Sequence, residues 1–471
     1  MCVVQYGEFK AVFFSISIDQ EKQRKPLDMS HADITDEYVE MSIIPPLMRD
    51  EYSHLRLSHN LIGDGGVEEI AGAIQDDKSG CLVIDLRANK ITTVGAVTLG
   101  EALTSNVSVT ELYLSQNDIG GPGAAALSRA FAPTTGGFSA VSVFDVRQCN
   151  IDDAGAEIMG GYMVGNTALK RLAFCGNFIG DDGATAIAKA LQNERCKMRQ
   201  VNLANNKINE RGGKMLGYSL KCNRELKQLV MSGNKIGDVG VAAFAESLEG
   251  VEEMAEEESE NPHAMMDMGS GKQRKKLAEA NPDQAKQVEV TAKPLQCGLR
   301  LLGLAGCGIT DNGIADLGGS LRTNKCLSTL DIRCNSLTDD GIVALARSLE
   351  ENTELRELYC GDNLFGAAAC VSLGSALARN VSLLTLDISG CDLSKTKAAE
   401  SLAEGLAGNG SLHELNISRS KLTDEGMQVR SEASCPLDHK RAHTCVLSLE
   451  LHRRCGNQRV PRAPHLPQQP A

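Results

Sequence analysis

The sequence predicts an α/β solenoid, a horseshoe in which a parallel β-sheet lines the inner side and helices form the outer layer. A short strand-and-turn phrase recurs along most of the chain, and each copy is followed by apolar residues at helical spacing. The composition fits a stack of similar layers, because 42% of the 471 residues are hydrophobic although the chain has no Trp, 7 Tyr and 10 Phe. We therefore expect an aliphatic core.

The strand-and-turn phrase reads apolar-x-apolar-x-x-Asn-x-apolar, as in Leu112-Tyr-Leu114-Ser-Gln-Asn117-Asp-Ile119. Its sixth position, the Asn slot, occurs in twelve copies, filled by Asn60, Asn89, Asn117, Cys149, Asn177, Asn206, Asn234, Cys307, Asn335, Asn363, Cys391 and Ser420. Successive slots lie 28 or 29 residues apart, except for 32 before Cys149 and 73 before Cys307. Such a ladder of spacings predicts a repeat array rather than separate domains.

Each copy is expected to form one strand followed by one helix. A period of two turns Leu112 and Leu114 inward and Tyr113 outward, and the slot Asn can hydrogen-bond backbone groups left unpaired where the strand turns. Helical spacing follows, as at Ile342, Leu345, Ala346 and Leu349. Between the two halves lies Gly/Thr-Asp-x-Gly, in which the Asp suits a helix N-cap and the Gly allows close approach to the neighbouring repeat.

These repeats resemble the ribonuclease-inhibitor type of leucine-rich repeats, including those of the Ran GTPase activator and of nucleotide-binding immune receptors. The resemblance covers about residues 51–427 outside one insert. It implies a leucine-rich repeat solenoid of about twelve 28- to 29-residue repeats. It also implies a surface for binding proteins, which is what such relatives share.

The pattern divides the chain into five parts. Residues 1–50 are an N-terminal leader or cap, 51–248 hold the first seven repeats, and 297–427 hold the last five. Residues 249–296 interrupt the array with seven Glu followed by the basic run 271–276, so we expect a disordered insert. Residues 428–471 are expected to be a disordered tail, whose Cys and His lack the paired spacing of a metal site.

Charge and composition exclude several classes of function. A net charge of -13 and a pI near 5.3 argue against a nucleic-acid partner. No apolar run approaches the ~18 residues of a membrane span, and the 16 Cys are interpreted as reduced thiols in the cytoplasm. A ciliary or cytoskeletal address stays open, and nuclear import through the basic run is less favoured. The glycosylation sequons at Asn106 and Asn380 are interpreted as chance matches within repeats.

No cofactor, metal or small-molecule substrate is expected, and no motif marks a catalytic nucleophile. The segment Gly269-Ser-Gly271-Lys272 departs from a phosphate-binding loop at Met266 and Gln273. The enzymatic alternative is activation of a Ran-like GTPase, because the segment from Glu111 to Asn117 resembles an element of that activator. The Arg that the resemblance requires is missing from the loop 61–66, and Arg211 lies after the element. We therefore expect no enzyme.

The expected binding surface is the inner sheet, where residues between the buried Leu positions face the hollow of the horseshoe. Pairs of Asp and Arg two residues apart should share this face, and Glu precedes both Tyr in Glu-Leu-Tyr. Aromatic and Arg side chains are the types that anchor protein interfaces. The candidate partner-binding residues are Arg56, Asp85, Arg87, Glu111, Tyr113, Asp145, Arg147, Arg171, Asp331, Arg333, Glu357, Tyr359, Asp387 and Glu414. A non-catalytic scaffold is thus predicted, with a structural component of a cilium or cytoskeleton as a third alternative.

Overall fold

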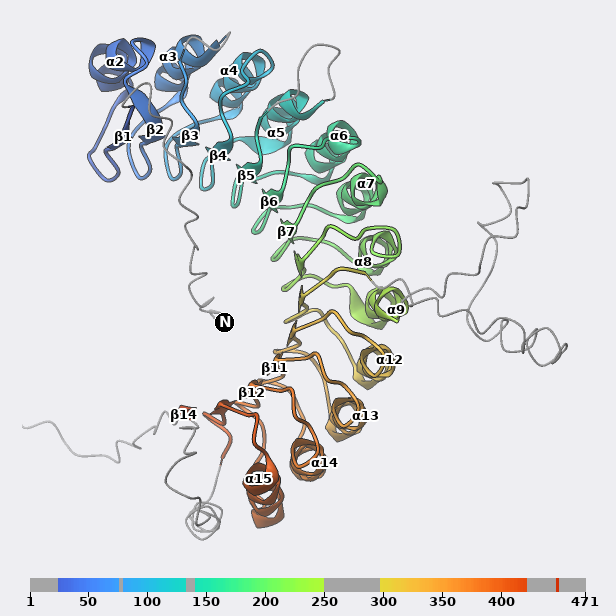
Figure 1. Cartoon of the computed structure of the whole chain (residues 1–471). Coiled ribbons are helices and arrows are strands. Elements are labelled where there is room, and N and C mark those ends of the chain that lie inside the picture. Colours follow the sequence, from blue (N-terminus) through green and yellow to red (C-terminus); the bar gives the residue numbers. More distant parts are fainter. Residues whose placement is uncertain (1–23, 76–78, 133–139, 250–296, 422–445, 449–471) are drawn as a thin grey trace, which may run out of the picture.

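A computed structural model describes residues 24–75, 79–132, 140–249, 297–421 and 446–448. These residues form one open arc, with strands on the inner side and helices on the outer side (Figure 1). All fourteen described strands belong to one parallel sheet whose spatial order follows the sequence. The predicted leucine-rich repeat solenoid is confirmed.

The inner sheet is built from very short strands. They are β1 (Lys25–Asp28), β2 (Tyr52–Arg56), β3 (Val83–Asp85), β4 (Glu111–Tyr113), β5 (Val143–Asp145), β6 (Arg171–Ala173), β7 (Gln200–Asn202), β8 (Gln228–Val230), β9 (Leu301–Gly303), β10 (Thr329–Asp331), β11 (Glu357–Tyr359), β12 (Thr385–Asp387), β13 (Glu414–Asn416) and β14 (Val446–Ser448). In nearly all of those with described burial, the middle residue is buried. The first and third residues face the hollow of the arc.

In the described part of the chain, the outer layer holds one helix for each repeat from β2 to β12. These helices are α3 (Asp64–Ile74), α4 (Thr93–Leu103), α5 (Gly120–Ser128), α6 (Asp153–Met163), α7 (Asp181–Gln192), α8 (Glu210–Ser219), α9 (Gly237–Leu248), α12 (Asp311–Leu321), α13 (Asp339–Leu349), α14 (Ala367–Leu377) and α15 (Thr396–Gly408). A short 3-10 turn, Arg129–Phe131, extends α5. At the N-terminal end, β1 and the segments α1 (Asp36–Tyr38), η1 (Val39–Ile43) and α2 (Ile44–Met48) stack on the first repeat.

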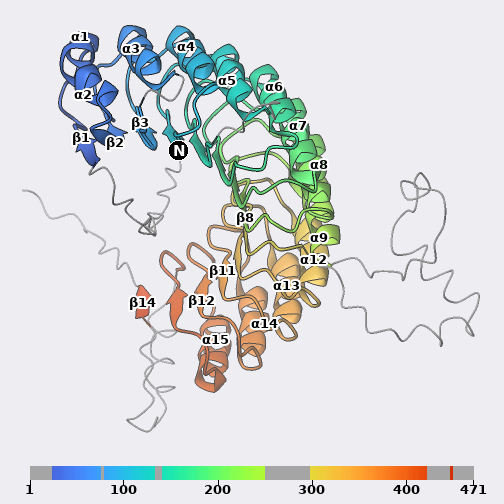
Figure 2. The ribbon, with the colours of Figure 1, turned by 45° about the horizontal axis from the view of Figure 1, so that its top comes forward.

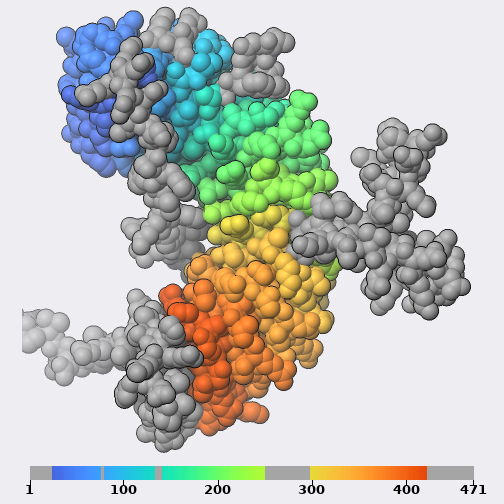
Figure 3. Space-filling view, viewed as in Figure 1, coloured from blue at the N-terminus to red at the C-terminus, as the bar shows by residue number. Residues whose placement is uncertain are grey.

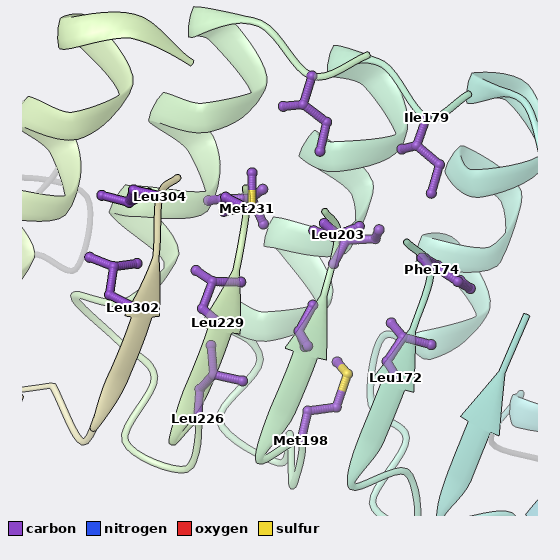
Figure 4. Packing of buried hydrophobic residues seen from close by; sticks show 14 of the residues in the cluster. Leu172, Phe174, Ile179, Met198, Leu203, Leu226, Leu229, Met231, Leu302 and Leu304 are labelled. Atoms are coloured by element: carbon purple, nitrogen blue, oxygen red, sulfur yellow. The ribbon is translucent and has the colours of Figure 1, made fainter. Parts of the chain in front are cut away.

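The core lies between the two layers, where residues of one repeat pack on those of the next. Figure 4 shows Leu172 on β6, Leu229 on β8 and Leu302 on β9 pointing toward the helices. The core is mainly aliphatic, as expected, but five Phe are fully buried, namely Phe131, Phe144, Phe174, Phe244 and Phe365. The rings of Phe131 and Phe144 pack edge to face with centroids 4.9 Å apart, so aromatic contacts supplement the aliphatic core there.

The slot Asn forms a ladder of hydrogen bonds along the sheet, as predicted. Asn335 donates Nδ2 to the carbonyls of Leu304 and Ile332, and its Oδ1 accepts from the N–H groups of Cys307 and Ile309. Cys307 itself fills a slot and donates Sγ to the carbonyl of Met231 at 3.4 Å. A thiol therefore replaces the donating half of the Asn side chain but not its accepting half.

A second Asn ladder, at the turn from helix to strand, was not predicted. Asn106 donates Nδ2 to the carbonyl of Ile74 at the end of the preceding helix, and its Oδ1 accepts from the N–H groups of Ser108 and Val109. Asn380 makes the same contacts to Leu349 and Leu383. Both side chains are buried. These sequon residues are ladder members, which agrees with their interpretation as chance matches.

The Asp of Gly/Thr-Asp-x-Gly does not cap its own helix, which corrects the prediction in most repeats. Asp311 is the first residue of α12, and its carboxylate accepts from the backbone N–H and hydroxyl of Thr338, the residue that precedes α13. The motif Asp of α6, Asp153, follows the same pattern and accepts from the N–H groups of Gly180 and Gly183. The preceding residue, Asp152, caps α6 through the N–H of Gly155. The predicted close approach at the Gly is confirmed, because a Cβ on Gly183 would lie 2.6 Å from the Cβ of Ala156.

The array continues in register across the insert. β8 pairs with β9, so Leu229 lies opposite Leu302, and Asp238 accepts from Thr310, 72 residues further along. The predicted interruption therefore leaves the stack of repeats unbroken. Residues 250–296 lie outside the described residues, as do the metal-site candidates of the tail, Cys435, His439, His443, Cys445 and Cys455. Within the described part, no group of His, Cys, Asp and Glu is placed to hold a metal ion.

Candidate functional site

The inner sheet carries two clusters of the same design. The first, on β3, β4 and β5, comprises Asp85, Arg87, Glu111, Tyr113, Asp145 and Arg147, and we call it the N-terminal cluster. The second, on β10, β11 and β12, comprises Asp331, Arg333, Glu357, Tyr359 and Asp387, and we call it the C-terminal cluster. In each, a Tyr lies in register between two Asp on the neighbouring strands.

The predicted pairing of Asp and Arg on one face is confirmed as bidentate ion pairs. Arg87 donates Nε and Nη2 to the two carboxylate oxygens of Asp85, at 2.8 and 2.5 Å. The pairs of Arg147 with Asp145 and of Arg333 with Asp331 have the same geometry. These hydrogen bonds raise the pKa of each Arg further above its ordinary value.

The Asp residues lie beneath the Arg residues that they hold. The side chain of Asp85 is 6% exposed whereas that of Arg87 is 39% exposed. Asp145 and Asp387 are buried as well. Among the predicted site residues, these Asp therefore hold the Arg side chains in place. The Arg and Tyr side chains form the accessible surface.

Each Tyr is fixed from both ends. The guanidinium carbon of Arg87 lies 5.3 Å from the ring centroid of Tyr113, and that of Arg333 lies 5.2 Å from Tyr359. The hydroxyl of Tyr113 donates to Glu111 at 2.7 Å, and that of Tyr359 to Glu357 at 3.3 Å. Burial and the Glu partner raise the pKa of Tyr359 to about 12, so both phenols stay neutral donors. An aromatic ring held in one orientation loses little entropy when a partner packs on it.

The sheet between the two clusters is uncharged in its central columns. The third strand residue and the residue two further on are small or neutral throughout β6 to β9: Ala173, Cys175, Asn202, Ala204, Val230, Ser232, Gly303 and Ala305. Seven strand steps of about 4.8 Å separate β4 from β11, which gives about 34 Å along the sheet. The two clusters therefore flank a neutral stretch of the sheet. This stretch was not predicted, although its columns could be read from the sequence.

Three predicted residues lie outside the clusters. Arg56 is half-buried on β2, next to Asp85 on β3. Arg171 is exposed on β6 and donates Nε to Gln200, and Glu414 is exposed on β13. None of the three shares the ring contact that defines the clusters.

The residues named for the GTPase alternative are engaged in structural contacts. Asn117 is buried, and its amide binds the carbonyls of Leu86 and Leu114. Arg211 is paired with Asp182 on the neighbouring helix, on the outer layer. Asn117 is thus a member of the Asn ladder and is covered from solvent.

Five segments match the model of a leucine-rich repeat family: residues 53–71, 105–128, 222–245, 323–346 and 408–429. Pig ribonuclease inhibitor is 25% identical over 208 residues, which cover 44% of this chain and 45% of that protein. Mouse ribonuclease inhibitor is 24% identical over 312 residues, covering 63% of this chain and 67% of that protein. The chain is a leucine-rich repeat protein of the ribonuclease-inhibitor type.

Other relatives of this leucine-rich repeat protein are much longer. Human NACHT, LRR and PYD domains-containing protein 5 is 28% identical over 194 residues, which cover 41% of the chain but only 16% of that protein. Among solved structures, an internalin from Listeria monocytogenes has a TM-score of 0.45 at 19% identity, covering 81% of this chain and 79% of its own. A chain of the yeast Rad7 and Elc1 complex has a TM-score of 0.43 at 15% identity, covering 88% of each.

Proposed function

We propose that this protein is a non-catalytic scaffold that binds a folded protein partner on the inner face of its solenoid. The observation that carries the proposal is the duplication of one constellation, since an Arg paired with Asp stacks on a Tyr held by Glu in both clusters. The solenoid fold needs no such contact, because the same columns hold Ala, Asn, Val and Gly between the clusters. Tyr and Arg are the side chains most enriched among residues that dominate binding energy.

The geometry also indicates the chemistry of the partner. Among the described residues, Nη1 of Arg87 and of Arg147 has no hydrogen-bond partner, so each guanidinium can still donate to a carboxylate or carbonyl. The Glu residues beside the Tyr can accept from Lys or Arg. A partner that touches both clusters must bridge seven strand steps, about 34 Å measured along the curved sheet, and present mixed charge. A folded domain meets that requirement better than a short peptide.

The test is affinity purification with mass spectrometry of the wild type and of Tyr113→Ala/Tyr359→Ala. We expect the main partner to be lost from the double variant, because each anchoring Tyr contributes ~2 kcal/mol or more once desolvated. The Tyr variants are preferable to Arg87→Glu, which would place a second carboxylate beside the buried Asp85 and destabilise the fold.

The matched control is Tyr218→Ala. Tyr218 lies on the outer helix α8 and also carries a cation on its ring, the ammonium of Lys221 at 4.5 Å. The Tyr218→Ala variant should retain the partner. Equal recovery of the partner from all three proteins would rule out the inner face as the binding surface.

A further inference from the structure

The turn that leads into the strands carries a row of cations in the middle of the arc. The residue just before the first residue of the strand is Lys170 for β6, Arg199 for β7, Lys227 for β8 and Arg300 for β9. We call these four residues the basic edge. The corresponding residue is Leu82, Thr110 or Ser142 in the three repeats before them and Ser328 in the repeat after them.

The four residues are stacked by a continuous backbone ladder. The N–H of Arg199 donates to the carbonyl of Lys170 at 2.7 Å, that of Lys227 to Arg199 at 2.8 Å, and that of Arg300 to Lys227 at 2.8 Å. The row therefore follows the strand spacing of about 4.8 Å and is about 14 Å long. The row precedes β6 to β9. The repeats of these strands, around β8, form the middle of the arc (Figure 2) and part of one continuous surface (Figure 3).

The positive charge of the row is not neutralised within the described part of the chain. Lys170, Arg199 and Arg300 are exposed, and no described carboxylate forms a salt bridge with any of the four residues. The ammonium of Lys227 donates instead to a backbone carbonyl, that of Arg224. Glu225, which feels the charges of Arg199 and Lys227, is itself paired with Lys197 at 2.8 Å.

The local field acts on that acid. The pKa of Glu225 is lowered first by its hydrogen bond with Lys197 and further by the charges of Arg199 and Lys227. Like charges on neighbouring strands repel and destabilise a sheet. The fold does not require them, because neutral residues take the same position in neighbouring repeats. A destabilising feature of this kind is characteristic of a functional surface.

We propose that the basic edge binds an acidic segment of a protein, a run of about four to six Asp or Glu in an extended chain. An extended chain advances ~3.3 Å per residue, so four or five residues match the length of the row. A nucleic acid is disfavoured, since four cations fall short of the 6 to 10 phosphate contacts of a typical strong complex. Its phosphates would also extend beyond the row, over a protein whose net charge is -13.

The test measures fluorescence anisotropy of a labelled hexaglutamate peptide with the full-length chain in 50 mM NaCl. We expect saturable binding that weakens about tenfold in Lys170→Gln/Arg199→Gln/Arg300→Gln, because three exposed ion pairs are lost. The single variants Lys170→Gln and Arg300→Gln, at either end of the row, should each weaken binding about two- to threefold.

The matched control is Lys90→Gln/Lys189→Gln/Lys397→Gln, which removes three exposed cations elsewhere. It should change binding less than about twofold. The edge variant should also melt no lower than the wild type, because its substitutions relieve repulsion. The proposal fails if the peptide does not bind, or if both triple variants weaken it equally. It also fails if a six-nucleotide uridine RNA binds more tightly than the peptide and is lost from the edge variant.

Discussion

At the scale of single residues, the Asn slot explains why the repeat is so regular. One amide satisfies two carbonyls and two N–H groups at the point where the strand turns, and no other side chain of that size offers both. This role could be predicted from the sequence, because Asn recurs at one position. The stacking of Arg87 on Tyr113 could not, because it depends on the register and side-chain rotamers of two different repeats.

Replacing a slot Asn should be costly. We expect Asn335→Ala to lower the free energy of unfolding by about 3 kcal/mol, because it leaves several buried backbone groups without a partner. Asn335→Cys should cost less, since Cys307 shows that a thiol can donate to the same kind of carbonyl. Chemical denaturation measures both. Asn312→Ala, at an exposed position on α12, serves as the control and should change little.

The buried thiols should resist alkylation. Burial raises the pKa of Cys149, Cys307 and Cys391 to about 12, so at pH 8 these groups are almost entirely protonated and unreactive. Thiolate forms only as the pH approaches that value, and stability should fall there because the unfolded chain deprotonates first. Iodoacetamide at pH 8 followed by peptide mapping should label the exposed Cys222 and spare these three. Labelling of all four at one rate would contradict the described burial.

At the scale of elements, each helix is held partly by the repeat before it. The Asp at the start of one helix binds the residue that precedes the next, so capping passes from repeat to repeat. The sequence predicted that this Asp caps a helix but could not show which helix. The residues of one repeat are the same whether the Asp binds its own helix or that of the next repeat. The burial of the strand centres and the helix faces followed directly from the periods of two and 3.6 residues.

Removing one such cap should weaken the neighbouring repeat. We expect Asp311→Ala to reduce the free energy of unfolding by about 1 to 2 kcal/mol, the usual effect of losing a charged N-cap. Hydrogen exchange should locate the loss at the start of α13, which follows Thr338, rather than in α12. Asp316→Ala, exposed within α12, is the control. Faster exchange at the start of α12 instead would mean that the Asp caps its own helix.

At the scale of the whole molecule, β8 and β9 pair in register across the insert. The repeats on either side of the insert therefore belong to one array rather than to two domains. The twelve slots predicted this continuity. They did not predict the two clusters or the neutral sheet between them, since a cluster appears only when columns are compared across neighbouring strands. The charge of each column could be read from the sequence. The contacts that distinguish a structured cluster from scattered surface charge could not.

Limited proteolysis tests the continuity of the array. We expect cleavage first within residues 249–296, with two fragments that still co-elute in gel filtration, because β8–β9 pairing and the contact of Asn324 with Leu248 join the halves. Replacing 250–296 by a short linker should leave the melting temperature nearly unchanged. A chain that unfolds on this deletion, or that is first cut within a repeat, would contradict the interpretation.

The central claim is that both clusters contact one protein partner. Once that partner is purified, isothermal titration of Tyr113→Ala, Tyr359→Ala and the double variant tests it most directly. We predict a loss of affinity of at least about tenfold from each single variant. The losses should be nearly additive in the double variant, because about 34 Å of sheet separates the two sites. Unchanged affinity in both single variants, with normal folding, would contradict the claim.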